Sequence, residues 1–276
     1  MKVFALALTV FTYTFVFSQD LPARSPKSTV SQKVGLCDIS ITYSRPSVKG
    51  RVIFDDLVPY GQVWRLGANE CTRLDISTAI TVGGTQIDSG SYALFLTPNK
   101  DGAWQFHINK DYKQWGSMSY DPIKNVAEMG VQPSQCQHTE TFSIQFTDIT
   151  NYGASIECRW ATTVVKLPFT VDTDAEVTKT IQAAIDKGKE LEQVHYRASN
   201  YYLQLKKDNI LALDHIEKSL AIEKDYYNLF LKAQILYAMG EGKEAKKLGK
   251  KAKKLAGKAG KPGWEDYMNR MMQDWN

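Results

Sequence analysis

The hydrophobic pattern of this chain changes its period near residue 170. Upstream, short segments alternate between apolar and polar residues: 39–43, 74–76, 103–108, 142–146 and 156–160. Downstream, apolar residues recur at helical spacing. Alternation is typical of half-buried strands, and the longer period is typical of amphipathic helices. The pattern therefore predicts an α+β chain, with an N-terminal antiparallel β-sandwich or barrel over 19–169 and a C-terminal helical hairpin module over 172–276.

The helical part carries capping signals and a weak internal repeat. Asp208 is expected to cap a helix that runs to residue 222, and Asp225 a helix that ends before Gly240. Ala212, Ile216 and Ser219 are echoed 33 residues later by Ala245, Gly249 and Ala252. This period resembles a tetratricopeptide repeat (TPR), and a plain bundle of helical hairpins is the alternative.

The first residues have the composition of an export signal. Lys2 precedes an apolar run over 3–17, which is too short to span a bilayer comfortably, and Ser18 is a small residue before a cut. We predict a signal peptide over 1–18, a mature protein that begins at Gln19 without a lipid anchor or transmembrane segment, and a periplasmic or extracellular location.

Four cysteines, Cys37, Cys71, Cys136 and Cys158, lie far apart and form no C-x-x-C pair. Their spacing does not support a zinc or thioredoxin-like site. Two disulfides, in any of three pairings, would suit an exported protein, and four free thiols in a fold that does not depend on them are the alternative.

A dense polar block over 43–70 is the candidate binding site. Its charges and aromatic rings lie between strand-like segments, and its prolines and glycines predict tight turns. Guanidinium groups beside aromatic rings suit carboxylates, phosphates, sulfated sugars or peptides. The structural alternative is that one arginine pairs with Glu70, Arg65 above all, while the others bond backbone carbonyls of the turns. The candidate residues are Tyr43, Arg45, Arg51, Tyr60, Trp64, Arg65, Asn69 and Glu70.

Catalytic and metal signatures are missing from the sequence. It contains no G-x-S-x-G, no phosphate-binding P-loop and no H-E-x-x-H, and its four histidines show no close pair. Spacing does not pair Glu70 with Asp75, Asp111 or Asp121 for acid–base work. We therefore expect no metal and no cofactor, and we favour a protein that is not an enzyme.

The segment Lys243–Lys261 holds nine lysines and one glutamate, although the formal charge of the whole chain is only +4. On a helix, lysines would surround a narrow face of alanines and leucines. Such a surface suits an anionic envelope component, namely a membrane leaflet, nucleic acid or acidic polymer. A solvated terminal helix that caps the repeat is the alternative.

Residues 25–169 resemble the DUF2911 family of exported bacterial proteins. The resemblance rests on SP at 25–26, VSQ at 30–32, YSRPSVKGR at 43–51, LVPYG at 57–61, VWRLGANE at 63–70, GSYALF at 90–95, NKD at 109–111 and QWG at 114–116. It implies an exported β domain, sometimes followed by a helical repeat region, and it supplies no reaction.

Together these features predict an exported, non-catalytic binding or scaffold protein. The helical repeat is expected to bind another protein or a peptide through its concave surface. The rival interpretation is an envelope hydrolase that acts on glycan or peptide at a cluster of Arg45, Arg65 and Glu70.

Overall fold

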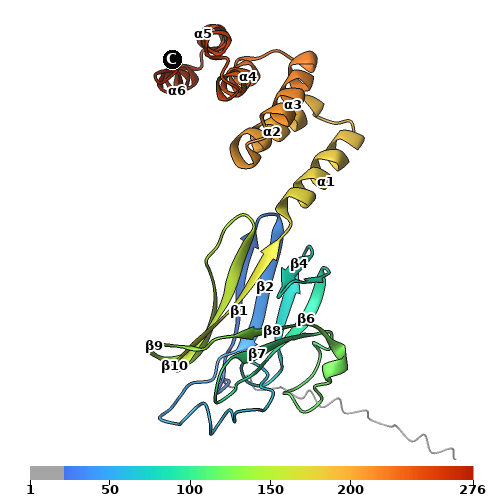
Figure 1. The fold of residues 1–276 in the computed structure, drawn as a ribbon, viewed down its shortest axis with the longest axis vertical. Coiled ribbons are helices and arrows are strands. Elements are labelled where there is room, and N and C mark those ends of the chain that lie inside the picture. The colour runs from blue at the N-terminus through green and yellow to red at the C-terminus, as the bar shows by residue number, and fades with distance from the viewer. Residues whose placement is uncertain (1–21, 276) are drawn as a thin grey trace, which may run out of the picture. The chain divides into compact units, whose positions relative to one another are not determined.

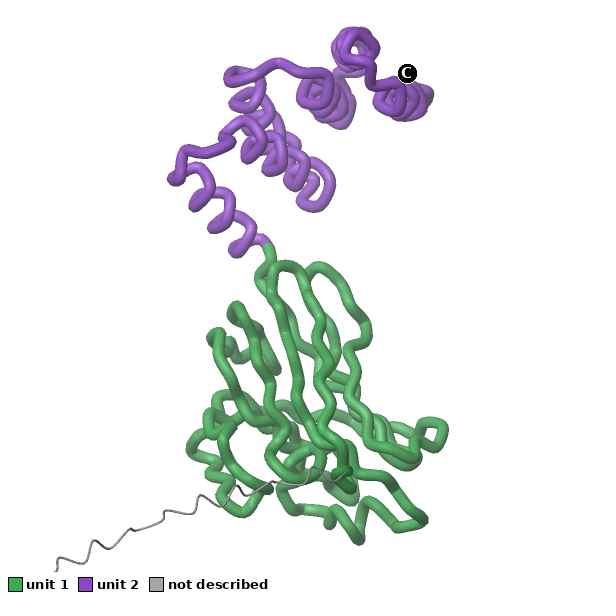
Figure 2. The backbone as a smooth tube through the Cα atoms, turned by 180° about the vertical axis from the view of Figure 1, so that it is seen from behind, with its two compact units in different colours: residues 1–173 green, residues 174–276 purple. Residues whose placement is uncertain are grey.

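The computed structural model describes residues 22–275, and contacts divide the chain between Thr173 and Asp174 into two compact units (Figure 2). The expected signal peptide over 1–18 and the cut before Gln19 lie outside the described residues. The prediction of a two-sheet β region followed by helices is confirmed.

Two antiparallel sheets form the β unit (Figure 1). The six-stranded sheet has the order β1 (Lys27–Val34), β2 (Cys37–Ser44), β3 (Thr72–Ile76), β6 (Gly90–Thr97), β7 (Trp104–Asn109) and β8 (Asn125–Val131). The four-stranded sheet has the order β5 (Thr85–Ile87), β4 (Ile80–Val82), β10 (Gly153–Val171) and β9 (Ser134–Thr147). A short 3₁₀ helix, η1 (Pro122–Lys124), precedes β8.

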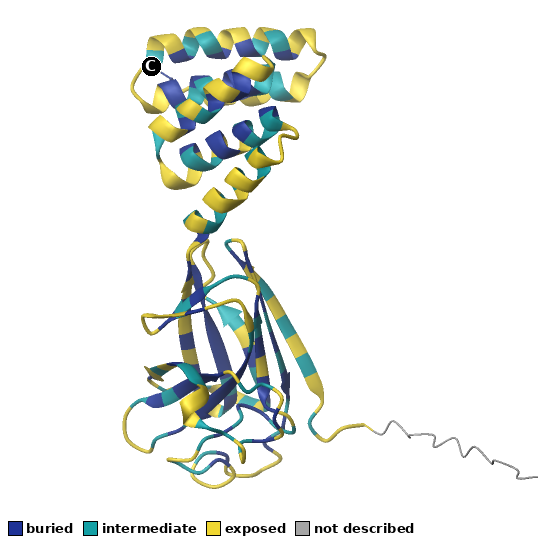
Figure 3. Cartoon of the chain, turned by 90° about the vertical axis from the view of Figure 1, so that its right-hand side faces the viewer, coloured by how far each residue is buried: buried dark blue, intermediate teal, exposed yellow. Residues whose placement is uncertain are grey.

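Alternation along the strands produces the core between the sheets. In β2, Cys37, Ile39, Ile41 and Tyr43 are buried, and the residues between them are more exposed (Figure 3). Successive side chains of a strand point to opposite faces, so each strand contributes one apolar face. The six-stranded sheet supplies Phe106 and the four-stranded sheet supplies Phe142 to the same hydrophobic cluster.

The last two strands are longer than the alternating segments predict. Segments 142–146 and 156–160 are the central parts of β9 and β10, which extend well beyond them. The register of this ribbon shifts on both sides of Ala161, whose φ is +51°. A bulge of this kind bends a strand and increases its local twist, and it interrupts the alternation that sequence reasoning depends on.

The helical unit contains α1 (Thr173–Asp186, which begins at the boundary), α2 (Leu191–Tyr201), α3 (Asn209–Ile222), α4 (Tyr226–Ala238), α5 (Gly242–Lys258) and α6 (Pro262–Met272). A π-helical turn, η2 (Tyr202–Lys206), continues α2. The predicted caps are confirmed: the Asp208 side chain accepts from the backbone N–H of Leu211, and Asp225 forms a reciprocal capping box with Asn228.

Small buried residues let these helices pack closely. Ala212, Ile216 and Ser219 of α3 are fully buried, as are Ala245 and Ala252 of α5. A Cβ on Gly249 would lie 2.5 Å from Met272 Sδ and 3.2 Å from the Trp275 ring, so a larger residue would force these side chains to shift where α5 meets the C-terminal segment. From α2 to α6, each helix contacts its sequence neighbours. Among the described residues, no helix has both the length and the apolar character needed to cross a membrane.

Candidate functional site

Two stacked indoles join the polar block to the four-stranded sheet. The rings of Trp64 and Trp160 lie 5.5 Å apart and are nearly parallel, and Phe142 meets both edge-on. Trp64 Nε1 donates to the carbonyl of Gly67 at 3.0 Å, which holds the ring beneath the following turn. The indoles are 9% and 2% exposed, so they form the base of the site and not an open wall.

All three arginines of the block donate to backbone carbonyls. Arg45 Nε donates to Phe142 O at 3.0 Å, Arg51 Nε to Val48 O at 3.0 Å, and Arg65 Nη1 to Asn69 O at 3.2 Å. These carbonyls lie in turns or at a sheet edge, where they would otherwise need water. Part of the block therefore stabilises the fold, as the structural alternative expects.

The predicted ion pair between Arg65 and Glu70 is wrong. Glu70 is half exposed and pairs with Lys27 at 2.9 Å. The reason is the backbone between the two residues: Leu66 and Asn69 both have positive φ, +52° and +60°. These left-handed residues turn the chain so that Glu70 forms an isolated bridge with Trp115 while Arg65 lies beside Asn69.

The remaining candidate residues have structural partners. Tyr43 is buried, and its hydroxyl accepts from the Ile144 N–H at 2.9 Å and lies 3.3 Å from the Ile144 carbonyl. Asn69 Nδ2 donates to Ser25 O and to Ser44 Oγ. Tyr60 is partly buried against the main hydrophobic cluster. Three of the eight candidates, Arg51, Trp64 and Arg65, line one pocket.

This pocket, called here the basic pocket, has a volume of about 420 Å³. Four cationic side chains line it, and none of the described residues that line it is acidic. Glu140 is not among the lining residues, but its Oε1 accepts from the backbone N–H of Lys49 at 2.9 Å. That bond, and more weakly His138 and Arg51, lowers the pKa of Glu140. The lining residues are Arg24, Ser25, Pro46, Ser47, Lys49, Arg51, Leu57, Val58, Trp64, Arg65, Gly67, Ala68 and Trp160.

One buried donor of the basic pocket lacks a partner. Trp160 Nε1–H makes no hydrogen bond to any described residue, although the side chain is only 2% exposed. Native proteins rarely leave a buried N–H unpaired, and each case calls for an explanation such as a water or a ligand. Sequence reasoning missed Trp160 because it lies 96 positions after Trp64.

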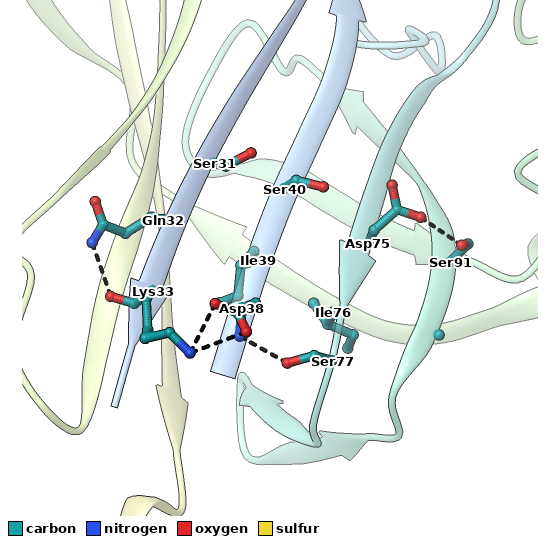
Figure 4. Close-up of a pocket in the computed structure, with 11 residues that line it drawn as sticks. Ser31, Gln32, Lys33, Asp38, Ile39, Ser40, Asp75, Ile76, Ser77 and Ser91 are labelled. Atoms are coloured by element: carbon teal, nitrogen blue, oxygen red, sulfur yellow. Dashed lines mark hydrogen bonds and ion pairs between the residues drawn. The ribbon is translucent and has the colours of Figure 1, made fainter. Parts of the chain in front are cut away.

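Another hollow of the β unit lies on the outer face of the six-stranded sheet (Figure 4). It has a volume of about 620 Å³ and follows a row of small polar residues across four strands, Ser31, Ser40, Asp75 and Ser91. Ser91 Oγ donates to Asp75, and Lys33 pairs with Asp38. The charged groups of this hollow are therefore already paired, so it has a weaker claim to an ionic ligand than the basic pocket.

The four cysteines are free thiols, as expected by the alternative to two disulfides. Cys37, Cys71 and Cys158 are buried, and burial raises the pKa of Cys71 and of Cys158. Raised pKa values disfavour the reactive thiolate. Among the described residues, no three histidine, cysteine or acidic side chains form a group suited to a metal ion.

The structure brings together two histidines whose spacing did not pair them. His195 of α2 and His215 of α3 meet with their Nδ1 atoms 2.9 Å apart, and Tyr202 stacks on His215. Burial is the main cause that lowers the pKa of both imidazoles. The contact depends on how α2 and α3 pack, which no local motif encodes.

The fold and the site define a class of protein: a two-sheet antiparallel β domain with a basic pocket, followed by a helical unit. Residues 25–169 match the family described as "Protein of unknown function (DUF2911)". The match covers more than half of the chain, and the chain belongs to the DUF2911 family. No curated protein and no solved structure matches the chain.

Proposed function

We propose that this chain is an exported, non-catalytic binding protein whose β unit holds a small anionic ligand in the basic pocket. The observation that carries the proposal is the charge of the lining: four cations and, among the described lining residues, no acid. A compact phosphate, sulfate or carboxylate group is the complementary ligand.

Two of the four cations are available for such a ligand. The side chains of Arg51 and Arg65 each donate to carbonyls, which holds them in place. The side chains of Arg24 and Lys49 form no hydrogen bond or ion pair with the described residues, and both are exposed at the pocket. Because the guanidinium groups of Arg51 and Arg65 are already held in place, less conformational entropy is lost when an anion binds between them and the two free cations.

The geometry favours binding over hydrolysis. The hydrolase alternative assigns the acid–base role to the Glu70 carboxyl group, which must then lie within reach of a substrate bound by Arg45 and Arg65. Glu70 lines a different hollow and pairs with Lys27. Arg45 donates a hydrogen bond to the carbonyl of Phe142. The Arg45, Arg65 and Glu70 cluster on which the hydrolase alternative depends is therefore not supported by these contacts.

For the helical unit, we propose binding of a protein or peptide partner and contact with an anionic envelope component through α5. Successive helices that contact their neighbours are the arrangement that exposes extended surfaces in repeat proteins, in keeping with a TPR-like module. Seven of the nine lysines over 243–261 are exposed, and one of these, Lys247, forms an ion pair with Glu244 at 3.8 Å.

Isothermal titration calorimetry of the purified chain with inorganic phosphate and with sulfate tests the β-unit proposal. The double change of Arg24→Gln and Lys49→Gln removes the two free cations and is expected to leave the fold intact. Charge-assisted hydrogen bonds contribute about 1.5–3 kcal/mol each, so the affinity should fall at least tenfold. Lys100→Gln, an exposed lysine between β6 and β7, is the matched control. Equal affinity for the double variant would contradict the proposal.

Export is tested separately by N-terminal sequencing of the protein recovered from its native host. The mature chain should begin at Gln19. Recovery of the intact Met1 terminus from the cytoplasm would contradict export without affecting the binding proposal.

A further inference from the structure

A second pocket of the β unit, called here the Trp115 pocket, also has a volume of about 420 Å³. It lies across the ends of β1, β2 and β3 and against the segment between β7 and η1. Its lining residues are Lys27, Thr42, Tyr43, Ser44, Glu70, Cys71, Arg73, Tyr112, Lys113, Gln114 and Trp115.

The indole of Trp115 is held in solvent by an anchored segment. It is 62% exposed. The backbone on both sides is nevertheless bonded: Cys71 N–H donates to Gln114 O at 3.1 Å, and Gly116 N–H donates to Asn69 O at 3.0 Å. The backbone that carries this exposed ring is therefore fixed by the fold. Exposed aromatic groups at the edge of a pocket are typical of binding sites.

The same pocket contains a buried acceptor without a partner. Gln114 is 8% exposed, and its Nε2 donates to Asp111 O at 2.8 Å. Its Oε1 accepts no hydrogen bond from any described residue. A ligand hydroxyl or amide N–H would supply that bond, directly or through one water.

The charged groups of the Trp115 pocket already have partners. Lys27 pairs with Glu70 at 2.9 Å, and Arg73 pairs with Asp75 at 2.9 Å. The ammonium group of Lys113 lies 5.6 Å from the centre of the Tyr112 ring. Hydroxyl, amide and indole groups therefore remain for recognition, which favours a neutral ligand over an ionic one.

From these three observations we propose that the Trp115 pocket is a binding site for a neutral saccharide. The C–H face of a pyranose ring would pack on the electron-rich face of the Trp115 indole. A hydroxyl or an N-acetyl N–H of the sugar would donate to Gln114 Oε1. The site is independent of the basic pocket, which has different lining residues and takes a ligand of different chemistry.

The test is an NMR titration of the purified chain with chitohexaose and with maltohexaose, two neutral oligosaccharides. Each of the six tryptophans gives one indole N–H resonance, and the resonance missing from Trp115→Phe identifies Trp115. We expect that resonance to shift saturably with at least one sugar. Trp115→Ala should weaken binding at least tenfold. Met118→Ala, a change of a 91% exposed residue in the same segment, should leave binding unchanged.

Gln114→Met separates recognition by the amide from packing on the ring. It removes the unpaired acceptor, and its melting temperature shows whether the fold is kept. A folded Gln114→Met variant with wild-type affinity would overturn the role of the amide. An unshifted Trp115 resonance with both sugars, or full binding by Trp115→Ala, would overturn the site.

Discussion

Arg45 provides the sharpest test of the structural part of the polar block. Its Nε donates to Phe142 O at 3.0 Å, and the Phe142 N–H donates to Pro46 O at 2.9 Å, so this short region joins the end of β2 to β9. Arg45→Met keeps most of the aliphatic length and removes the charged donor. Phe142 is 1% exposed, so water could not readily replace the hydrogen bond that its carbonyl would lose.

The expected cost follows from the type of bond. A hydrogen bond to a charged group contributes about 1.5–3 kcal/mol to stability. For a unit of about this size, each kcal/mol lowers the melting temperature by roughly 2–4 °C. Arg45→Met should therefore lower the transition of the β unit by roughly 3–12 °C.

Differential scanning calorimetry of the full chain measures this change, and the transition of the helical unit serves as an internal reference. Arg73→Met is the matched control, since Arg73 is about half exposed and pairs with Asp75 on the outer face of the sheet. Exposed pairs contribute about 0–1 kcal/mol. If Arg45→Met melts within about one degree of the wild type, the bond to Phe142 O is not a stabilising one and the reasoning is refuted.

Three further predictions concern an ion pair, the histidine pair and a turn glycine. A double-mutant cycle for Lys27 and Glu70 should give a coupling of about 0.2–1 kcal/mol, and the cycle for Arg65 and Glu70 should give none; a clear coupling in the second cycle would contradict the described turn. Burial lowers the pKa of His195 and His215, so the unfolded chain binds protons more readily as the pH falls through about 6.5. The helical unit should be most stable above that pH and lose stability below it, whereas His195→Gln with His215→Gln should flatten the profile measured by urea unfolding. Gly67→Ala should destabilise the β unit, because a Cβ would lie 2.8 Å from the backbone oxygen of Ser44; a wild-type urea midpoint would contradict this.

The order of strands and helices could be predicted where local chemistry decides it. Alternation along Ile39–Tyr43 reflects a strand with one buried face, and Asp208 and Asp225 are caps because a short carboxylate can reach an unpaired backbone N–H. The ends of β9 and β10 could not be predicted, because pairing across a long ribbon with a bulge at Ala161 overrides the local pattern.

The site could be predicted only in part, for a different reason. The arginines and Trp64 stood out by composition, yet their partners depend on turns. Leucine rarely adopts positive φ, so nothing in the sequence indicated the left-handed Leu66 that separates Arg65 from Glu70. The contributions of Trp160 and of the His195–His215 contact depend on tertiary packing between distant segments.

The most direct test of the basic pocket is the indole N–H resonance of Trp160 during a titration with inorganic phosphate, with sodium chloride at matched ionic strength as the control. If the pocket binds an oxyanion such as phosphate, this resonance should shift saturably with phosphate and not with chloride. The indole of Trp104, whose Nε1 already donates to Asn99 O at 2.9 Å, should remain fixed. A Trp160 resonance that stays unchanged over the whole phosphate titration would contradict the central claim.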